Sequence, residues 1–369
     1  MEEKGKRYRF MDVLRLLSML AIVFYHMTVT LYLMGIRQLS SVRIFYENAN
    51  MHIAKVGVGL FFMLSGAGLM LSGEGKNGFS VKDFYRKRFV RILIPFYIVY
   101  AAYFLYLLIW NGGKTADLFA GRGANPLSAV FTLLGMDAYL SNFGIPTYSL
   151  GIGEWFLGCL VIMYLIYPLL RRLLKRNRIL FAGILLVYYI GILSVYGRFS
   201  FAASVPPFLN AAVKIFDFAL GMFLADILPK IPKWTIFPAL AVNAFYAVCP
   251  VTVPGNDSFG IVIQCLAVFL IFYGLEPFFG KDAAKGPMKA VSFLCKVSYE
   301  YYLIHHVVID ALTGRNRNIP FSNFDVLLLF LKEILLTAAL TAVLKLILWG
   351  IGRCFLKKHE ESGGGKKDE

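Results

Sequence analysis

The sequence predicts an all-α protein, a polytopic membrane bundle of about ten transmembrane helices with both termini in the cytoplasm. Composition is the first reason: 58% of the 369 residues are hydrophobic and only 16% are charged, whereas about 25% are charged in an ordinary soluble domain. Long apolar segments recur along the chain, and Lys and Arg gather in every second loop. These features exclude a soluble enzyme, a disordered chain and a nucleic-acid-binding protein, despite the net charge of +16.

Ten apolar segments have about the length that crosses a bilayer. They are residues 11–34, 53–71, 89–110, 154–171, 179–197, 208–228, 234–251, 258–279, 290–311 and 325–352. No small-residue cleavage site follows the first segment, and Asp12 and Arg15 lie at its start. We therefore interpret it as a permanent span and not as a signal peptide. An even number of spans leaves both termini on one side of the membrane.

The loops between these segments predict which side is cytoplasmic. Basic residues cluster in residues 76–91, 171–178, 230–233, 281–289 and 353–358. Because cytoplasmic loops carry the excess of Lys and Arg, these loops and both termini are assigned to the cytoplasm. The long loop 111–153 then lies outside, and its apolar piece 126–139 is too short to span and is expected to be interfacial or re-entrant.

The chain is expected to form one membrane domain over residues 1–356. Residues 357–369 are rich in Gly and charge and are expected to be a disordered cytoplasmic tail. The cysteines show no ligand spacing, so we expect neither a disulfide framework nor a metal site. They are Cys159, Cys249, Cys265, Cys295 and Cys354.

Ionisable residues inside a membrane helix are costly and are therefore candidates for function. Arg15 and His26 are eleven residues apart in the first span. At about 100° per residue this separation is about 20° from three full turns, so both face one way, roughly 16 Å apart along the axis. A neutral imidazole in a buried cavity can act as a general base for a hydroxyl. The simpler alternative is a histidine that only hydrogen-bonds a neighbouring helix.

Two further arginines, Arg88 and Arg91, lie at i and i+3 at the cytoplasmic mouth of the third span. Such a fork suits a phosphate-bearing ligand. The alternative is plain anchoring of the helix, or a contact with the headgroups of membrane lipids.

Two more ionisable residues are candidates near the outer side. Glu154 begins the fourth span and can hold a histidine in one tautomer or bind sugar hydroxyls, unless it is only an interfacial charge. His305 lies deep in the ninth span on one stripe with Ser298 and Tyr302, where it either takes part in chemistry or only packs and makes one hydrogen bond. Its neighbour His306 is expected to point about 100° away.

At these residues the chain resembles the acyltransferase-3 family of integral-membrane acyltransferases, which includes bacterial surface-polysaccharide O-acetyltransferases. The opening FMDVLRLLSMLAIVFYH resembles the family's first-helix signature. The pattern FF-x-x-SG at residues 61–66, the pair Arg88-x-x-Arg91 followed by Pro95, the sequence EWFL from Glu154 and the late SYEYYLIH follow in order. Five such motifs in sequence, from residue 10 to about 306, are specific although each alone is weak.

The resemblance implies a ten-helix fold with an inner cavity and an O-acyltransferase activity. An acyl group, usually acetyl from acetyl-CoA or from another acyl-CoA, would pass to a surface polysaccharide or other glycan outside the cell membrane. His26 would be the base or acyl acceptor, Arg15 would support it or meet CoA, and Arg88 and Arg91 would hold CoA phosphates. Glu154 and His305 complete the candidate catalytic set, and no metal is expected.

Two questions stay open at the sequence level. Some members of the family carry an extracytoplasmic serine-esterase domain after the spans, so here either a separate partner finishes the transfer or the membrane domain acts alone. The alternative function is a transporter or flippase for a glycan or lipid-linked sugar, which would also contain buried charges and a central cavity. The missing inverted repeat and the arginines on one side argue against that alternative.

Overall fold

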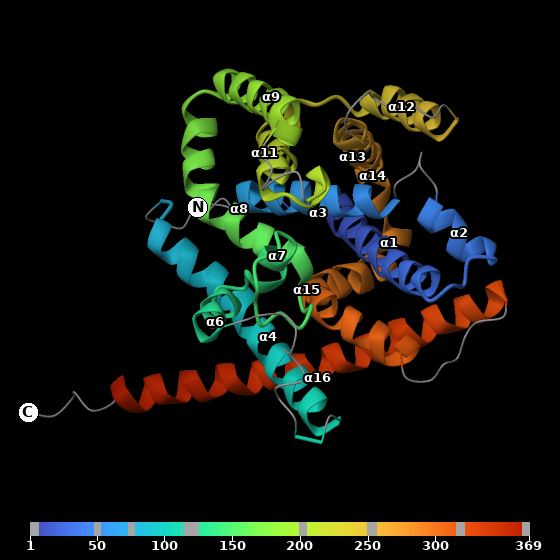
Figure 1. Cartoon of the computed structure of the whole chain (residues 1–369). Helices are drawn as coiled ribbons and strands as arrows, with labels where there is room; N and C mark the ends of the chain where they lie inside the picture. Colours follow the sequence, from blue (N-terminus) through green and yellow to red (C-terminus); the bar gives the residue numbers. More distant parts are fainter. Residues whose placement is uncertain are drawn as a thin grey trace, which may run out of the picture.

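The all-helical class is confirmed by the computed structural model (Figure 1). The structure describes residues 7–47, 53–72, 78–110, 112–113, 125–198, 205–248, 257–314 and 322–363. Within these ranges every regular element is an α-helix or a short 3-10 helix.

Ten longer helices in the described ranges match the ten predicted segments in order. They are α1 (Arg9–Leu33), α3 (Ile53–Leu71), α4 (Val81–Trp110), α8 (Glu154–Arg176), α9 (Arg178–Val195), α11 (Ala211–Ile227), α12 (Ile236–Val248), α13 (Asp257–Gly274), α15 (Lys285–Gly314) and α16 (Asn323–Gly363). Between the first two lies α2 (Ser40–Glu47), which the sequence analysis did not anticipate.

Seven of these helices, namely α1, α3, α4, α8, α9, α13 and α16, are long and apolar enough to cross a membrane. Within the described residues the other three are shorter or more polar: α11 has 17 residues, α12 has 13, and α15 carries two histidines and several charges. The chain is therefore a multi-pass membrane protein. The number of ten spans and the sidedness of the termini stay predictions.

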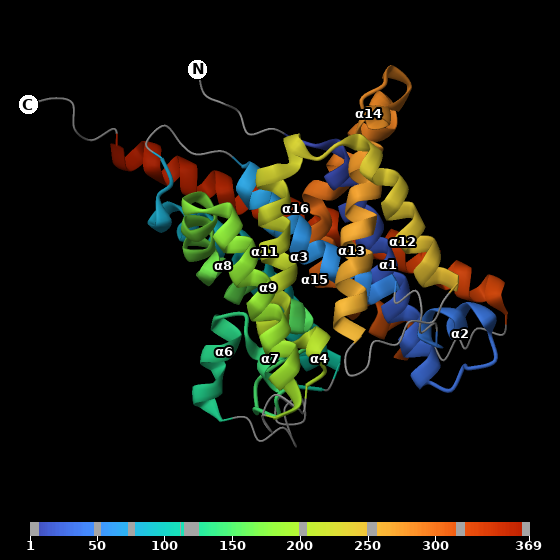
Figure 2. The ribbon, with the colours of Figure 1, turned by 90° about the horizontal axis from the view of Figure 1, so that it is seen from above.

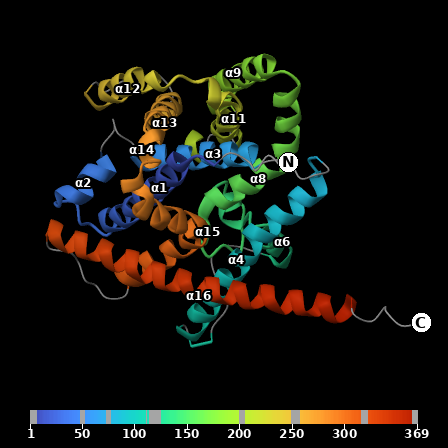
Figure 3. The ribbon, with the colours of Figure 1, turned by 180° about the vertical axis from the view of Figure 1, so that it is seen from behind.

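The helix α3 lies at the centre of the bundle and packs on α1, α11 and α13, while α15 packs on α1, α4 and α16 (Figures 1 and 3). Close packing of α3 on α11 depends on two glycines. A Cβ atom at Gly66 would overlap the backbone of Phe218, and one at Gly221 would overlap the backbone of Met63. Beside this contact Lys214 and Asp217 form a buried ion pair, with Nζ 2.7 Å from Oδ2.

The two ends of the bundle differ. At one end, Glu276 of α14 (Glu276–Phe279) accepts hydrogen bonds from the backbone amides of Arg9 and Phe10 at 3.0 and 2.7 Å. At the other end lie two short helices, α6 (Ala129–Leu133) and α7 (Asp137–Ser141) (Figure 2). Neither is long enough to span, and α7 packs on α8. These short helices therefore cover one end of the bundle without crossing it.

The last helix extends further than the sequence predicts. We placed the start of a disordered tail at residue 357, but α16 continues to Gly363. Lys and Glu, which dominate these positions, are good helix formers, so nothing in them stops the helix. Residues 364–369 of the predicted tail lie outside the described residues, and the division into domain and tail stays a prediction.

Candidate active site

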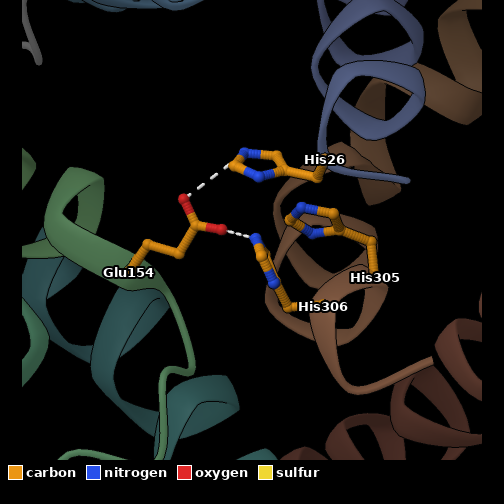
Figure 4. Close-up of side chains that lie close together, drawn as sticks. All are labelled: His26, Glu154, His305 and His306. Carbon is orange, nitrogen blue, oxygen red and sulfur yellow. Dashed lines mark ion pairs between the residues drawn. The ribbon is translucent and has the colours of Figure 1, made fainter. Parts of the chain in front are cut away.

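Three histidines and one glutamate lie close together, with their side chains facing one another (Figure 4). His26 comes from α1, His305 and His306 come from α15, and Glu154 faces them from the first residue of α8. The Nε2 atom of His26 lies 3.5 Å from Oε2 of Glu154, and Nε2 of His306 contacts the other carboxylate oxygen. The ring of His26 is centred 4.3 Å from that of His306 and 5.4 Å from that of His305.

The position of Glu154 depends on an unusual backbone turn. Gly151 and Gly153 have φ angles of 78° and 71°, and Glu154 itself has φ 43°. A side-chain-bearing residue rarely adopts this left-handed region, because its Cβ crowds the backbone. The hydroxyl of Tyr302 donates a 2.7 Å hydrogen bond to the carbonyl of Gly153, so α15 holds the turn in place. The strained residue is thus the one whose carboxylate meets the histidines.

His305 is fixed in one tautomer. Its Nδ1 lies 2.5 Å from the carbonyl oxygen of Tyr302. Because a carbonyl oxygen can only accept, Nδ1 carries the proton and Nε2 presents a lone pair. The residue is 1% exposed, and Nε2 has no hydrogen-bond partner among the described residues.

A cavity of about 360 Å³ begins at this cluster. His26 and Glu154 line it, whereas His305 and His306 touch those two residues but do not line it. Its wall is built from α1, α3, α4, α8 and α15. The volume is in the range of sites for small molecules.

The same cavity contains three arginines and a lysine: Arg15, Arg88, Arg91 and Lys296. All three arginines line the cavity together with Tyr164, and their charges act on its hydroxyl. Arg15 donates to Sγ of Cys295 at 3.2 Å and to the carbonyl of Leu64 at 3.4 Å.

This arginine group, defined as Arg15, Arg88 and Arg91, gathers three positive charges at one cavity. In the described part of the chain no carboxylate forms an ion pair with any of the three. Arg15 lies roughly 16 Å along α1 from His26. One cavity therefore joins a cationic region to a histidine–glutamate region.

The structure brings together all six residues singled out from the sequence, Arg15, His26, Arg88, Arg91, Glu154 and His305. Their catalytic and binding roles stay predictions. His52, at the start of the predicted span 53–71, lies outside the described residues.

Two site residues were missed at the sequence level. His306 was expected to point away, and it does diverge from His305, but toward Glu154 rather than out of the site. The sequence feature that could have identified it is the pair of adjacent histidines inside one predicted span. Lys296 was not considered, although a charge inside a predicted span is itself a signal.

The comparisons with known proteins decide the family. The acyltransferase-3 family model, described as an acyltransferase domain, matches residues 8–351. The chain belongs to this family. Neither the curated proteins nor the solved structures gave a significant match. The five helices that line the cavity lie within the matched range, so the cavity is part of the acyltransferase domain of a membrane acyltransferase.

Proposed function

We propose that this acyltransferase moves an acyl group, acetyl in the first instance, from cytoplasmic acyl-CoA to a hydroxyl of an extracytoplasmic glycan. The carrying observation is the single cavity with the arginine group in one region and His26 with Glu154 in another. An anionic donor that reaches a base through the membrane needs both regions in one continuous space. The cell membrane is the proposed location.

The arginine group supports a phosphate-bearing donor. Guanidinium groups form strong, directional hydrogen bonds with phosphate oxygens, and Arg15, Arg88 and Arg91 are not engaged by carboxylates in the described residues. With the phosphates of CoA held there, the pantetheine arm would extend along α1 toward His26. The thioester carbonyl would then lie next to the base.

His26 would act as the general base. Glu154, with Oε2 3.5 Å from Nε2, favours the tautomer whose proton is on Nε2. Nδ1 then takes the proton of the acceptor hydroxyl while the hydroxyl oxygen bonds to the thioester carbon. The carbon–sulfur bond breaks, and the proton passes from the imidazolium to the leaving CoA thiolate. Glu154 stabilises the imidazolium between these steps.

Ser65, which lines the cavity from α3, is our candidate donor for the oxyanion of this reaction. Two other polar residues, Tyr302 and His305, are less suited, because Tyr302 already donates to the carbonyl of Gly153 and His305 does not line the cavity. A preorganised hydroxyl typically stabilises the developing charge by a few kcal/mol, roughly 10²–10³-fold in rate.

The test is transfer by the purified full-length chain. Acetyl-CoA and a surface glycan should together release free CoA thiol and yield an acetylated glycan in the mass spectrum. Movement of glycan across vesicles without thiol release would contradict the proposal and favour a transporter. Thiol release that needs native membranes, and fails with the purified chain, would indicate a separate partner that completes the transfer.

A further inference from the structure

We propose that His26, Glu154, His305 and His306 form a binding site for a divalent transition-metal ion of the zinc class, and that its occupancy stops acyl transfer. Each residue offers one ligand atom, and the four atoms all lie within 4.8 Å of one another. They come from three helices that are far apart in the sequence. Three imidazoles and one carboxylate are a set of ligands that suits zinc.

The orientation of His305 is the second observation. A histidine that ligates a metal usually donates its other ring N–H to a carbonyl or carboxylate, which fixes the tautomer and aims the lone pair. His305 does this through Nδ1 and the carbonyl of Tyr302, at 2.5 Å. Its Nε2 is buried and without a partner among the described residues. Packing alone gives no reason for an aimed, unpartnered lone pair.

The charge of the site also favours a cation. Glu154 is largely buried, with 15% of its side chain exposed, and among the described residues only His26 and His306 pair with it. The facing histidines compensate a carboxylate only when protonated, and their crowded rings would then repel one another. A metal ion instead binds neutral imidazoles and supplies the positive charge itself.

The donor atoms select the metal. Imidazole nitrogen suits Zn²⁺, Co²⁺, Ni²⁺ and Cu²⁺, whereas Mg²⁺ and Ca²⁺ prefer oxygen ligands only. No cysteine belongs to the set; Cys295 contacts Arg15 instead. We therefore expect zinc to bind and magnesium not to.

The consequence for activity rests on the proposed function. His26 is the proposed base, and a metal bound through its lone pair removes that base. Four protein ligands also complete a tetrahedral site, so no position stays open for water or substrate. Bound zinc thus acts as an inhibitor that competes with protons and substrate for the same side chains.

Metal binding is measured first, without reference to activity. Full-length protein, purified in detergent and stripped with EDTA, is titrated with Co²⁺ as a spectroscopic probe. The expected result is one equivalent of Co²⁺ with the visible absorption of a four-coordinate ion, displaced by Zn²⁺. His305→Ala should weaken Co²⁺ binding by at least about 10–100-fold, the loss typical for an outer-sphere partner alone. His359→Ala, in the tail predicted from the sequence, is the matched control and should bind as the parent does.

A second measurement uses the unmodified chain and is independent of how variants fold. Zn²⁺ should protect the peptides that contain His26 and His305 with His306 from carbethoxylation, while the His359 peptide reacts equally with and without the metal. Absence of saturable Co²⁺ binding, equal carbethoxylation of all these peptides, or a thiolate charge-transfer band would overturn the inference.

Activity is measured last. Zn²⁺ should stop acyl transfer in proportion to occupancy, EDTA should restore it, and Mg²⁺ should have no effect. A metal-free protein that is inactive until zinc is added would overturn the inhibitory role. If Co²⁺ binds as expected but no acyl transfer is found, the proposed function fails and the metal site stands.

Discussion

Glu154 is the residue at which backbone strain and chemistry coincide. Its φ of 43° is unfavourable for any residue with a Cβ, by roughly 1–2 kcal/mol. The adjoining Gly153, with φ 71°, meets no such cost. The carboxylate between His26 and His306 is the feature that the strain maintains.

This strain predicts a trade between stability and activity. Glu154→Gly should raise the free energy of unfolding by about 1 kcal/mol, because it removes the left-handed strain, while it lowers acyl transfer. Glu154→Gln keeps the strain and is the matched control: it should lose activity without gaining stability. Thermal unfolding in detergent and thiol release from acetyl-CoA measure the two effects. Loss of stability in the glycine variant would show that the carboxylate contacts outweigh the strain.

His26 and His306 should differ in their effect on transfer. His26 lines the cavity, whereas His306 does not. His26→Ala should therefore reduce the transfer rate by about 10²–10⁴-fold, the usual contribution of a general base, in a protein that still inserts and folds. His306→Ala should reduce it less, since it acts only through the position of Glu154. A folded His26→Ala protein with full activity would exclude the proposed mechanism.

At the scale of elements, the first turns of α4 offer a matched set of arginines. Arg88 and Arg91 line the cavity, whereas Arg86 pairs with Asp83 at 3.2 Å and does not line it. Arg88→Ala and Arg91→Ala should each raise the KM for acyl-CoA by about 10–100-fold, which corresponds to roughly 1.5–3 kcal/mol for a contact with a charged phosphate.

The control for this pair is Arg86→Ala, which should leave the donor KM unchanged. The measurement is the acyl-CoA dependence of the initial rate at saturating acceptor. If all three variants change membrane insertion alike and leave the donor KM alone, the arginines are anchors or contacts to lipid headgroups.

The short helix α7 carries a buried acid outside the long helices. Asp137 is 2% exposed, and burial raises its pKa from 3.8 to about 6. Because the folded state favours the protonated form, this carboxyl stabilises the fold fully below pH 3.8, and the contribution is lost as pH rises through about 6. Asp137→Asn should abolish this pH dependence and, above pH 6, raise the free energy of unfolding by up to about 3 kcal/mol. The measurement is the free energy of unfolding of the parent and the variant at about pH 5 and about pH 8. If the variant keeps the pH dependence of the parent, Asp137 is not its source.

The sequence predicted where most of the helices lie along the chain, but it did not predict how the helices are arranged relative to one another. The predicted span 53–71 coincides with α3, because the length and apolar composition of a segment are enough to predict a membrane helix. The common face of Arg15 and His26 followed from helical periodicity, and both line the cavity. The position of His306 did not follow, because it depends on how α8 meets α15.

That meeting is determined by contacts remote in sequence. The turn before α8 is held by Tyr302, 149 residues on. The contact of α3 with α11 depends on Gly66, where no side chain fits. Periodicity describes one helix at a time, so it shows which residues share a face and not which faces meet. The family resemblance supplied the functional grouping, whereas the four-residue cluster required the three-dimensional structure.

At the scale of the whole molecule, the mechanism requires a fixed sidedness. The donor must enter from the cytoplasm, where acyl-CoA is made, and the acceptor from outside. The basic clusters at the start of α4 and at the end of α8 lie on one predicted side. In Figure 2, α14 lies at one end of the bundle and α6 with α7 at the other.

Single cysteines in a cysteine-free background test this sidedness with an impermeant thiol reagent. Asn142 on the α7 side, and Arg176 and Asp282 on the opposite predicted side, are exposed. Two other loop residues, Asn125 and Asn177, are avoided because their side chains cap helices. Asn142→Cys should label in intact cells, whereas Arg176→Cys and Asp282→Cys should label only after lysis. Labelling of Arg176→Cys from outside would place the arginine group on the side that lacks acyl-CoA, and transfer from a cytoplasmic donor would then be impossible by this route.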